Sequence, residues 1–302
     1  MIYEYKLTVA VLTMNRSEQL REAIDSCLDC KLPEKTEFVI IDNASTDNTE
    51  SVVLELMAKT EYDVVYSRQE KNLGVGGGRA VAFDRARGEY VYFLDDDAII
   101  SENCRDTFFS DTVSYLDGHP RVASLTTHIH DEIFGDERMD VMTDIPCEGK
   151  LMAFFFLGGS HFLRHSCFTS PLCLNVIYGA EEYLPSIRAI DNGFFNVYDP
   201  EISIIHKPRI NKWSGNSETS FDVKARAIAV PYATKRLLYP KILAPILWLG
   251  YRRRISRHIA SSPSAKATAK TIVAEILKNN KQKKIKFSTV TGMYKHFGST
   301  VF

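Results

Sequence analysis

Along the first hundred residues, segments with the apolar pattern of a strand alternate with segments with the apolar spacing of a helix. Short runs that are apolar on both faces indicate strands, and they occupy residues 6–14, 37–45, 64–68 and 90–94. Apolar residues at helical spacing indicate helices, and they occupy residues 17–28, 46–59 and 79–87. Strands that alternate with helices in this way form a mostly parallel sheet that helices cover on both faces. The pattern therefore predicts an α/β fold.

The second half of the pattern is less regular. Residues 154–164 predict two strands joined by a turn at Gly158 and Gly159. Residues 178–193 predict a short helix that an Asn-Gly pair stops, and residues 195–207 predict two short strands. A loop over 207–218 follows, and the chain beyond it is helical. We therefore predict an α/β domain over residues 1–215 and a helical extension over residues 216–302.

Polar clusters follow each of the predicted strands in the first half. They occupy residues 13–15, 42–47, 72–79 and 95–97. The carboxyl ends of parallel strands lie at one edge of the sheet, and ligands of such sheets bind outside that edge. We expect these four clusters to form one binding site.

The last of these clusters is Asp95-Asp96-Asp97, directly after a buried strand. Three like charges repel each other unless a cation offsets them. Strand alternation would point Asp95 and Asp97 to one side and Asp96 to the other, and oxygen ligands with one histidine favour Mg²⁺ or Mn²⁺. Such ions commonly hold substrate phosphates. The alternative is an acidic helix N-terminus, because Ser101 and Glu102 follow.

Composition and charge narrow the function class. The 302 residues are 45% hydrophobic and 25% charged, as in ordinary globular proteins. No secretory signal opens the chain and no run of about 18 apolar residues occurs, so we expect a cytoplasmic protein. The six cysteines show no disulfide framework, which fits that compartment. The main domain is acidic and lacks a recognition motif, which argues against nucleic-acid binding.

The net charge of −1 conceals a basic extension, which has thirteen Lys and Arg from residue 241 onward against one acid, Glu275. Residues 237–259 combine an apolar stretch containing Trp248 with an arginine cluster at residues 252–254. This combination is typical of helices that lie in an anionic membrane interface. The alternative is a helix packed on the α/β domain or on a partner subunit of a homo-oligomer.

Several other features have weaker functional readings. The Gly-rich segment 72–79 is predicted to be a flexible turn near a nucleotide, with a plain connection as the alternative. We expect Cys27 and Cys30 to have packing roles, and we treat the His128 and His130 pair as poor support for a metal site. Trp213 is predicted to form a lid over an acceptor or to pack on the domain.

Taken in order, the motifs resemble the family 2 glycosyltransferases of the GT-A fold over roughly residues 8–207. The resemblance rests on VLTMNR, IIDNASTDNTE, NLGVGGGRAVAFDRARGEYVYFLDDD, FLGGSHFLRHSCF, YGAEEYLPSIRAIDNGF and IIHK. It implies an inverting enzyme that uses a nucleotide-sugar donor, UDP- or dTDP-linked, and a divalent metal, Mn²⁺ or Mg²⁺. It also implies a saccharide or lipid-linked acceptor in surface polysaccharide synthesis, and peripheral location at the inner face of the cell membrane.

The resemblance implies a role for each matching residue. The nucleotide would contact Thr13, Asn15, Asp42, Asn43, Arg79, Asp95 and Asp96. In that set, Asp42 would accept the imide N–H of the base, and Asp95 would reach the ribose or the metal. The metal ligands would be Asp97, Asp95 and His206. Gly158 and Gly159 would let the acceptor or sugar approach the backbone.

The catalytic base would be Glu182, with Glu181 beside it, and either could take the proton of the acceptor hydroxyl. The chain departs from the family here, because Glu181-Glu182 replaces a Glu-Asp or Asp-Asp pair and Leu184 stands where an acid is common. Pro185 is also unusual near a helix start. Two alternatives to the transferase remain. One is a nucleotidyltransferase and the other is a degenerate, membrane-docked binding module.

Overall fold

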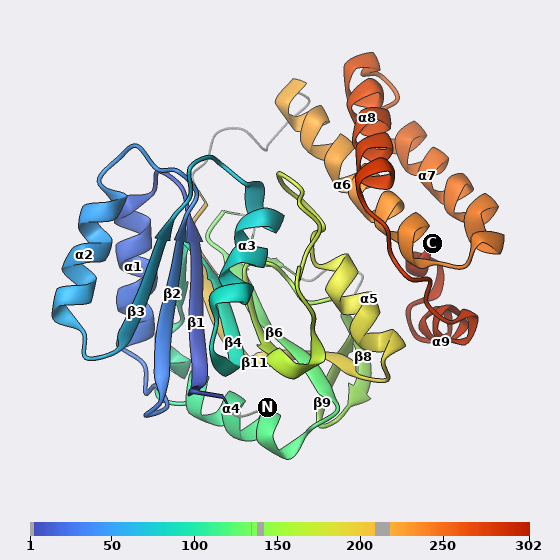
Figure 1. Ribbon diagram of the computed structural model, residues 1–302. Helices are drawn as coiled ribbons and strands as arrows, with labels where there is room; N and C mark the ends of the chain where they lie inside the picture. The colour runs from blue at the N-terminus through green and yellow to red at the C-terminus, as the bar shows by residue number, and fades with distance from the viewer. Residues whose placement is uncertain (1–2, 134, 138–141, 209–217) are drawn as a thin grey trace.

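The computed structural model describes residues 3–133, 135–137, 142–208 and 218–302 (Figure 1). A single twisted sheet occupies the centre, and within these residues its strand order is β3-β2-β1-β4-β10-β6-β11-β9-β8. Short strands β5 and β7 pair with β11 and β6. The strands are β1 (Tyr5–Thr13), β2 (Thr36–Asp42), β3 (Asp63–Arg68), β4 (Gly88–Asp95), β5 (Ala98–Ile100), β6 (Val122–Asp131), β7 (Gly135–Glu137), β8 (Met142–Cys147), β9 (Lys150–Ala153), β10 (Ser160–Arg164) and β11 (Phe195–His206).

The first four strands are parallel, as the sequence predicts. Strand β1 lies between β2 and β4, and their registers pair Thr13 with Asp42 and Leu12 with Asp95. All three strands therefore end at one level. The chain order reverses beside β1, because β2 and β3 lie on one side of it and β4 on the other, and such a reversal opens a crevice for ligands.

The second half of the sheet is mixed. Strand β10 is antiparallel to both β4 and β6, whereas β11 is parallel to β6 and antiparallel to β9. The two short strands predicted over 195–207 are one strand, β11, whose register shifts between Asp199 and Ser203. The prediction of a strand that begins at Phe154 is wrong, because β9 has already ended at Ala153. The first strand of the predicted pair therefore lies earlier in the chain.

Helices cover both faces of the sheet. They are α1 (Ser17–Leu28), α2 (Thr49–Lys59), α3 (Gly74–Arg85), α4 (Phe108–Gly118) and α5 (Tyr183–Asp191). Alternate residues of β1 point to opposite faces, so Val9 packs in one core with α1, α2 and α4, while Ala10 packs with α3 on the other side. The predicted two-faced burial is thereby confirmed.

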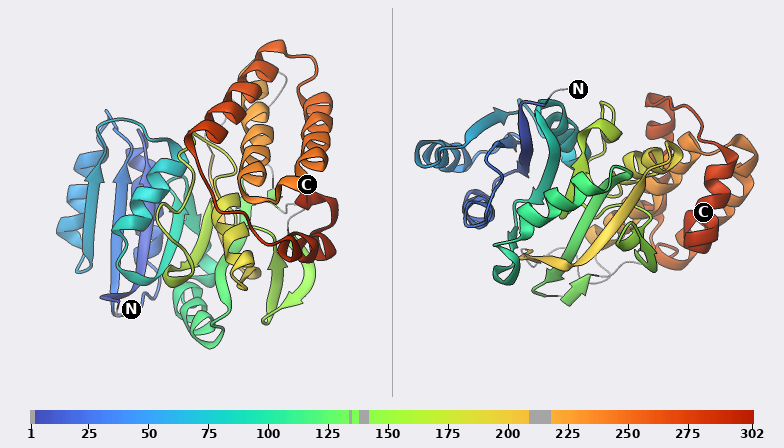
Figure 2. Two further views of the ribbon diagram at one scale, coloured as in Figure 1. Left: turned by 45° about the vertical axis from the view of Figure 1, so that its right-hand side comes forward. Right: turned by 90° about the horizontal axis from the view of Figure 1, so that it is seen from below.

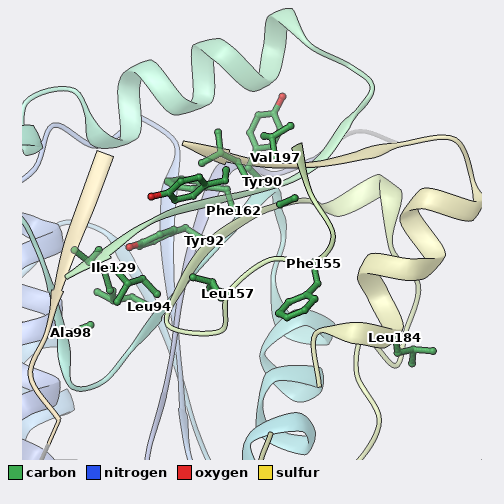
Figure 3. Close-up of a cluster of buried hydrophobic side chains, with 14 of the residues drawn as sticks. Tyr90, Tyr92, Leu94, Ala98, Ile129, Phe155, Leu157, Phe162, Leu184 and Val197 are labelled. Carbon is green, nitrogen blue, oxygen red and sulfur yellow. The ribbon is translucent and has the colours of Figure 1, made fainter. Parts of the chain in front are cut away.

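The larger core centres on aromatic rings of β4 and β10. Figure 3 shows Tyr92 beside Phe162, whose ring centroids lie 4.4 Å apart, and Phe108 and Phe109 of α4 pack edge-on against the Tyr92 ring. The buried Tyr92 hydroxyl lies 2.9 Å from the Ser160 hydroxyl, so its polar end is satisfied. This core fixes β4 and β10 side by side, and both strands lead into the site.

The Gly-rich segment is not the predicted flexible turn, because helix α3 already begins at Gly74. The amide nitrogens of Val75 and Gly76 donate to the carbonyls of Ile177 and Val176, at 2.9 and 3.2 Å. A Cβ atom on Gly74 or Gly76 would collide with the backbone of this neighbouring segment. The glycines therefore let residues 174–177 cross the start of the helix closely, and this crossing positions the acidic pair that follows.

The C-terminal extension is a helical layer on one side of the sheet domain (Figure 2). Its helices are α6 (Glu218–Leu238), α7 (Ala244–His258), α8 (Pro263–Asn279) and α9 (Phe287–Phe297). Helix α6 packs against both α7 and α8. The division predicted near residue 215 lies outside the described residues and stays a prediction. No helix in the described ranges is both long and apolar enough to cross a membrane.

The extension is docked on the α/β domain by specific contacts. Phe297 stacks near Phe154 with ring centroids 5.2 Å apart. Lys235 of α6 is buried beside the Phe154 and Tyr183 rings and donates to the carbonyl of Thr300. Burial lowers the pKa of this lysine to about 7, and the charge of Arg254 adds to the effect. The extension therefore shares a core with the domain.

Candidate active site

The loops after β1 and β2 are fastened to each other by side-chain hydrogen bonds. Asn15 has a backbone φ of 54°, and its side-chain oxygen accepts from the backbone amide of Thr46 at 2.7 Å. The backbone amide of Asn15 donates to the Ser45 hydroxyl. Asp42 is fully buried at the end of β2, where the Ser45 amide and the Tyr66 hydroxyl donate to its two oxygens. The structure thus fixes the orientation of the carboxylate that was predicted to contact the base.

Asn43 holds the turn that leads into α3. Its amide nitrogen donates to Asn72 Oδ1 and to the Gly74 carbonyl, both at 3.1 Å, and its oxygen accepts from the Leu73 amide. Thr13 is buried at the end of β1, and its carbonyl accepts from the Asn43 amide. These residues gather where the sequence predicts, but the hydrogen bonds of the Asn43 side chain hold the protein's own turn.

A first cluster of charges, here called the Arg16 cluster, comprises Arg16, Asp96, Asp97 and His206. Arg16 Nη1 lies 2.8 Å from Asp96 Oδ1 and 2.6 Å from Asp97 Oδ2. His206 Nε2 lies 3.3 Å from Asp97 Oδ1, and its Nδ1 lies 2.9 Å from Asp131 Oδ2. One guanidinium and one imidazole therefore balance the two buried aspartates.

The protonation states in this cluster depend on these contacts. Burial raises the pKa of Asp96 to about 6 against the attraction of Arg16. Burial also acts on Asp97, but the His206 bond and the Arg16 charge outweigh it and lower the pKa of that carboxyl. For His206, burial is outweighed by Asp97 and Asp131, which together raise its pKa to about 9.

A second cluster, here called the Arg79 cluster, comprises Arg79, Asp95, Glu181 and Glu182. Arg79 Nη2 lies 2.8 Å from Asp95 Oδ1, and Nη1 lies 2.6 Å from Glu181 Oε1 and 3.4 Å from Glu182 Oε1. Nη2 also donates to the Gly158 carbonyl at 2.8 Å. Arg79 therefore joins the carboxyl end of β4 to the acidic pair across 87 residues of chain.

The acidic pair leads into α5, as predicted, although the helix begins later than residue 178. Helix α5 begins at Tyr183, with Glu182 as its N-cap residue. Pro185 is the third residue of the helix, where its missing N–H costs no intrahelical hydrogen bond, and this accounts for the unusual proline. Gly193 adopts a φ of 90° and ends the helix, which confirms the predicted Asn-Gly stop.

Gly158 provides space for the Arg79 cluster itself. A Cβ at this position would lie 2.5 Å from Glu182 Oε1 and 2.7 Å from Arg79 Nη1. At Gly159 a Cβ would meet only Ile129 Cδ1 at 3.2 Å and Asp95 Oδ2 at 3.7 Å. Approach by an acceptor or sugar, the role predicted for both glycines, stays a prediction.

Glu182 is the carboxyl group most altered by its surroundings. Burial and the neighbouring charge of Glu181 raise its pKa to about 8, although Arg79 acts in the opposite direction. Glu181 Oε2 is buried without a hydrogen-bond partner among the described residues. An acid with its pKa near neutrality, close to a strand edge, is suited to accept a proton from a substrate.

The sequence reasoning missed several residues that contact the predicted site residues, among them Arg68, whose Nε lies 3.7 Å from Asp42 Oδ2. Arg16, Tyr66 and Asp131 contact predicted site residues, yet no role was expected for any of them. Arg16 had a signal, since it directly follows the polar cluster after β1. His128, which lies near the Tyr198 hydroxyl, and the buried Cys27 and Cys30 are not part of either cluster. Trp213 lies outside the described residues.

A divalent metal suits the Arg16 cluster chemically. No set of three or more His, Cys, Asp or Glu side chains within the described ranges is already gathered as a metal site. Asp97 and His206 nevertheless supply an oxygen and a nitrogen at one point, and Arg16 beside them is 36% exposed. Asp95, the third predicted ligand, is bonded to Arg79 instead. Two of the three predicted ligands therefore lie together.

The fold is that of the GT-A glycosyltransferases, as comparison with two solved structures shows. The S. aureus TarS 1–349 structure with UDP-GlcNAc superposes with a TM-score of 0.65 at 14% identity, covering 98% of this chain and 89% of that one. GalNAc-T7 with UDP, GalNAc and Mn²⁺ gives 0.63 at 13% identity, covering 97% and 58%. These likenesses confirm the predicted fold, including a helical C-terminal region.

The sequence model of the family named Glycosyl transferase family 2 matches residues 8–169, more than half of the chain. The chain belongs to this family. A curated relative from Campylobacter jejuni, GalNAc(5)-diNAcBac-PP-undecaprenol beta-1,3-glucosyltransferase, is 36% identical over 92 residues. That match spans 30% of this chain and 29% of the relative. The chain thus aligns with less than a third of that relative's length.

Proposed function

We propose that this protein transfers a sugar from a nucleoside diphosphate donor to a saccharide or lipid-linked acceptor in cell-surface glycan synthesis. The observation that carries the proposal is the Arg79 cluster. Arg79 holds Asp95, at the predicted donor side, next to Glu182, a carboxyl suited to act as base. Donor and acceptor chemistry therefore meet around one buried guanidinium. UDP is favoured over dTDP because both structural neighbours described above contain UDP or UDP-GlcNAc.

In the proposed reaction, Glu182 takes the proton of an acceptor hydroxyl. The hydroxyl oxygen forms a bond to the anomeric carbon while the bond from that carbon to the diphosphate oxygen breaks. The nucleoside diphosphate leaves with the electron pair, and direct displacement inverts the anomeric centre. Asp42 would hold the base of the donor, because its carboxylate is fixed at the end of β2.

A divalent cation fits the proposal through Asp97 and His206, with Asp95 as a further ligand. When bound, Mn²⁺ or Mg²⁺ would stabilise the charge on the departing diphosphate. Arg16 is the residue that balances Asp96 and Asp97 in this structure, and its partial exposure leaves it room to move. GalNAc-T7, which has a similar fold, was crystallised with Mn²⁺, and this supports a divalent metal in the proposed site.

A lipid-linked acceptor would be met at a membrane surface. The Campylobacter relative acts on an undecaprenol-linked substrate by its name, which supports this acceptor class. We therefore include in the proposal a cytoplasmic location with peripheral attachment through residues 237–259. Transfer to a soluble saccharide is the alternative within the same chemistry.

The first experiment is calorimetric binding of UDP and dTDP, each with Mn²⁺ and with EDTA. Wild type should bind UDP more tightly with Mn²⁺, and Asp97→Ala should lose that metal dependence. Asp106→Ala, which removes an exposed aspartate, is the control and should bind as wild type does. Equal binding in EDTA would contradict the metal assignment. Absence of binding by both nucleotides would contradict the donor site and favour a degenerate binding module.

A second readout distinguishes the nucleotidyltransferase. That enzyme would consume a nucleoside triphosphate and release inorganic diphosphate, whereas the proposed enzyme releases a nucleoside diphosphate. Incubation with UDP-sugars and with UTP plus sugar phosphates, followed by phosphorus NMR, identifies the product. Diphosphate release from UTP would overturn the proposed function.

A further inference from the structure

Helix α7 and the turn before it expose apolar side chains away from the sheet. Figures 1 and 2 place α7 on the side of the extension that faces away from the α/β domain. Ile242 is 78% exposed and Trp248 is 50% exposed, and Ile246 and Leu249 are exposed with them. Leu247, on the opposite side of the helix, is buried. One face of α7 is therefore apolar at its N-terminal end without any covering element among the described residues.

The same face becomes basic toward the C-terminal end of the helix. Arg252, Arg253 and Arg257 are exposed, and at 100° per residue Arg252 lies on the side of Trp248, whereas Arg253 and Arg257 lie on the side of Ile246, with Leu249 between the two sides. The guanidinium of Arg252 lies over the Trp248 ring, 5.0 Å from its centroid. An apolar patch bordered by arginines is the arrangement that suits the boundary between lipid tails and anionic headgroups.

A basic cavity lies at the N-terminal end of α7, on the side of the helix that carries Ala244 and Leu247. It has a volume of about 230 Å³ and an apolar lining that includes Tyr239 and Leu247. Arg236, Lys241 and Lys284 line the same cavity. No carboxylate in the described part of the chain forms an ion pair with any of the three cations. Lys284 is fixed in place, because it donates to the carbonyls of Arg236 and Leu237.

These cations repel each other in the absence of an anion. Burial lowers the pKa of Lys284, and the charges of Arg236 and Lys241 lower it further. A phosphate group in the cavity would offset the repulsion and accept hydrogen bonds from all three side chains. Since the cavity adjoins exposed Ile242, a phosphate attached to a lipid could enter it while the apolar residues contact lipid tails.

We propose that the α7 face, defined as Ile242, Ile246, Trp248, Leu249 and the three exposed arginines, docks on an anionic phospholipid bilayer, with a lipid phosphate in the neighbouring cavity. Charge complementarity favours this occupant, since the extension has thirteen basic residues and one acid from residue 241 onward. The inference extends the peripheral attachment within the proposed function.

The test is cosedimentation of the full chain with vesicles of phosphatidylglycerol and phosphatidylcholine, compared with vesicles of phosphatidylcholine alone. Wild type should bind only the anionic vesicles, and added salt should weaken binding. The double variant Trp248→Ser/Leu249→Ser should weaken binding at least about tenfold, because it removes the apolar contact. The control Leu54→Ser changes an equally exposed apolar residue on α2 and should bind as wild type does.

The cavity is tested by Lys241→Gln, which should weaken binding to anionic vesicles about fivefold, the effect of one basic residue near such a surface. Lys31→Gln, on the α/β domain, is its matched control. The inference would be overturned if Trp248→Ser/Leu249→Ser and Lys241→Gln both bound anionic vesicles as tightly as wild type does. It would also be overturned if wild type failed to bind anionic vesicles. So would a wild-type dimer that Trp248→Ser/Leu249→Ser converts to a monomer. UDP calorimetry on each variant checks folding and tests the transferase proposal separately.

Discussion

The Arg16 cluster and the Arg79 cluster meet the same electrostatic problem in two ways. Each gathers carboxylates at the carboxyl edge of the sheet and balances them with one arginine. Arg79 is only 5% exposed and has four acceptors within hydrogen-bond distance, whereas Arg16 is 36% exposed and contacts two. Arg79 is therefore built into the core, whereas Arg16 is partly open to solvent.

This difference separates a permanent scaffold from an exchangeable cation. A buried charge network is costly to break because each group left behind is an unpaired charge in a low dielectric. In the Arg16 cluster the two aspartates are buried but the arginine is 36% exposed, so another cation can reach and replace it from solvent. The comparison supports the proposed roles, in which Arg79 holds the base in place and Arg16 yields to a metal and a diphosphate.

The largest expected effect concerns the base. Glu182→Gln should lower turnover with UDP-sugar and acceptor by about 100- to 10,000-fold, because an amide cannot take the hydroxyl proton. Calorimetric binding of UDP should remain, since the donor residues are unchanged. The control is Glu102→Gln, whose side chain is 86% exposed far from either cluster. Undiminished turnover in Glu182→Gln would transfer the role to Glu181 or refute it.

The next largest effect compares the two arginines directly. Arg79→Met should lower the free energy of unfolding by about 3–5 kcal/mol, because three carboxylates lose their shared cation. Arg16→Met should lower it by less, because Arg16 is partly exposed and Asp97 keeps its contact with His206. Urea unfolding followed by circular dichroism measures both. Similar losses in the two variants would show that burial does not distinguish the clusters.

The two neighbouring glycines offer a smaller contrast. Gly158→Ala should cost about 1–3 kcal/mol, the usual range for overpacking, since the new methyl group collides with Glu182 and Arg79. Gly159→Ala should cost less, because its methyl group meets only the tip of Ile129 closely. Thermal unfolding of the two variants measures both losses of stability. A larger loss in Gly159→Ala would contradict the packing described for the Arg79 cluster.

The last comparison concerns the pH dependence of stability. Glu182 has its pKa raised from 4.5 to about 8, so between these values the folded protein holds a proton that the unfolded chain has released. The contribution of this group is therefore complete below pH 4.5 and is lost as the pH rises through 8. The free energy of unfolding should fall more steeply across that window in wild type than in Glu182→Gln. Parallel profiles would refute the raised pKa.

The sequence predicted the family, the fold and the position of the site. Strands β1, β2 and β4 end in polar residues, and parallel pairing brings these ends to one level whatever the details of packing. Asp42, Asp95 and Asp97 therefore reached the same edge as expected. Their roles toward base and metal remain predictions, as does the base role of Glu182.

The errors share a cause in contacts between distant segments. The glycines at 74–78 were expected to form a turn, because glycine disfavours helix interiors. In the structure they lie in the first turns of α3, where residues 174–177 pass close to three of them and the Leu12 side chain lies against Gly78. Arg16 was likewise left without a role, because its partners Asp96 and Asp97 lie 80 residues further along the chain.

The sequence by itself determined which chemical groups are present and at which strand ends they lie, because strand and helix periodicity are local properties. Only the tertiary structure decided how those groups pair. It placed Arg79 between Asp95 and the two glutamates, and it left Arg16 in solvent contact. Burial and distance set the strength of a charge interaction, and both arise only when segments remote in sequence pack together.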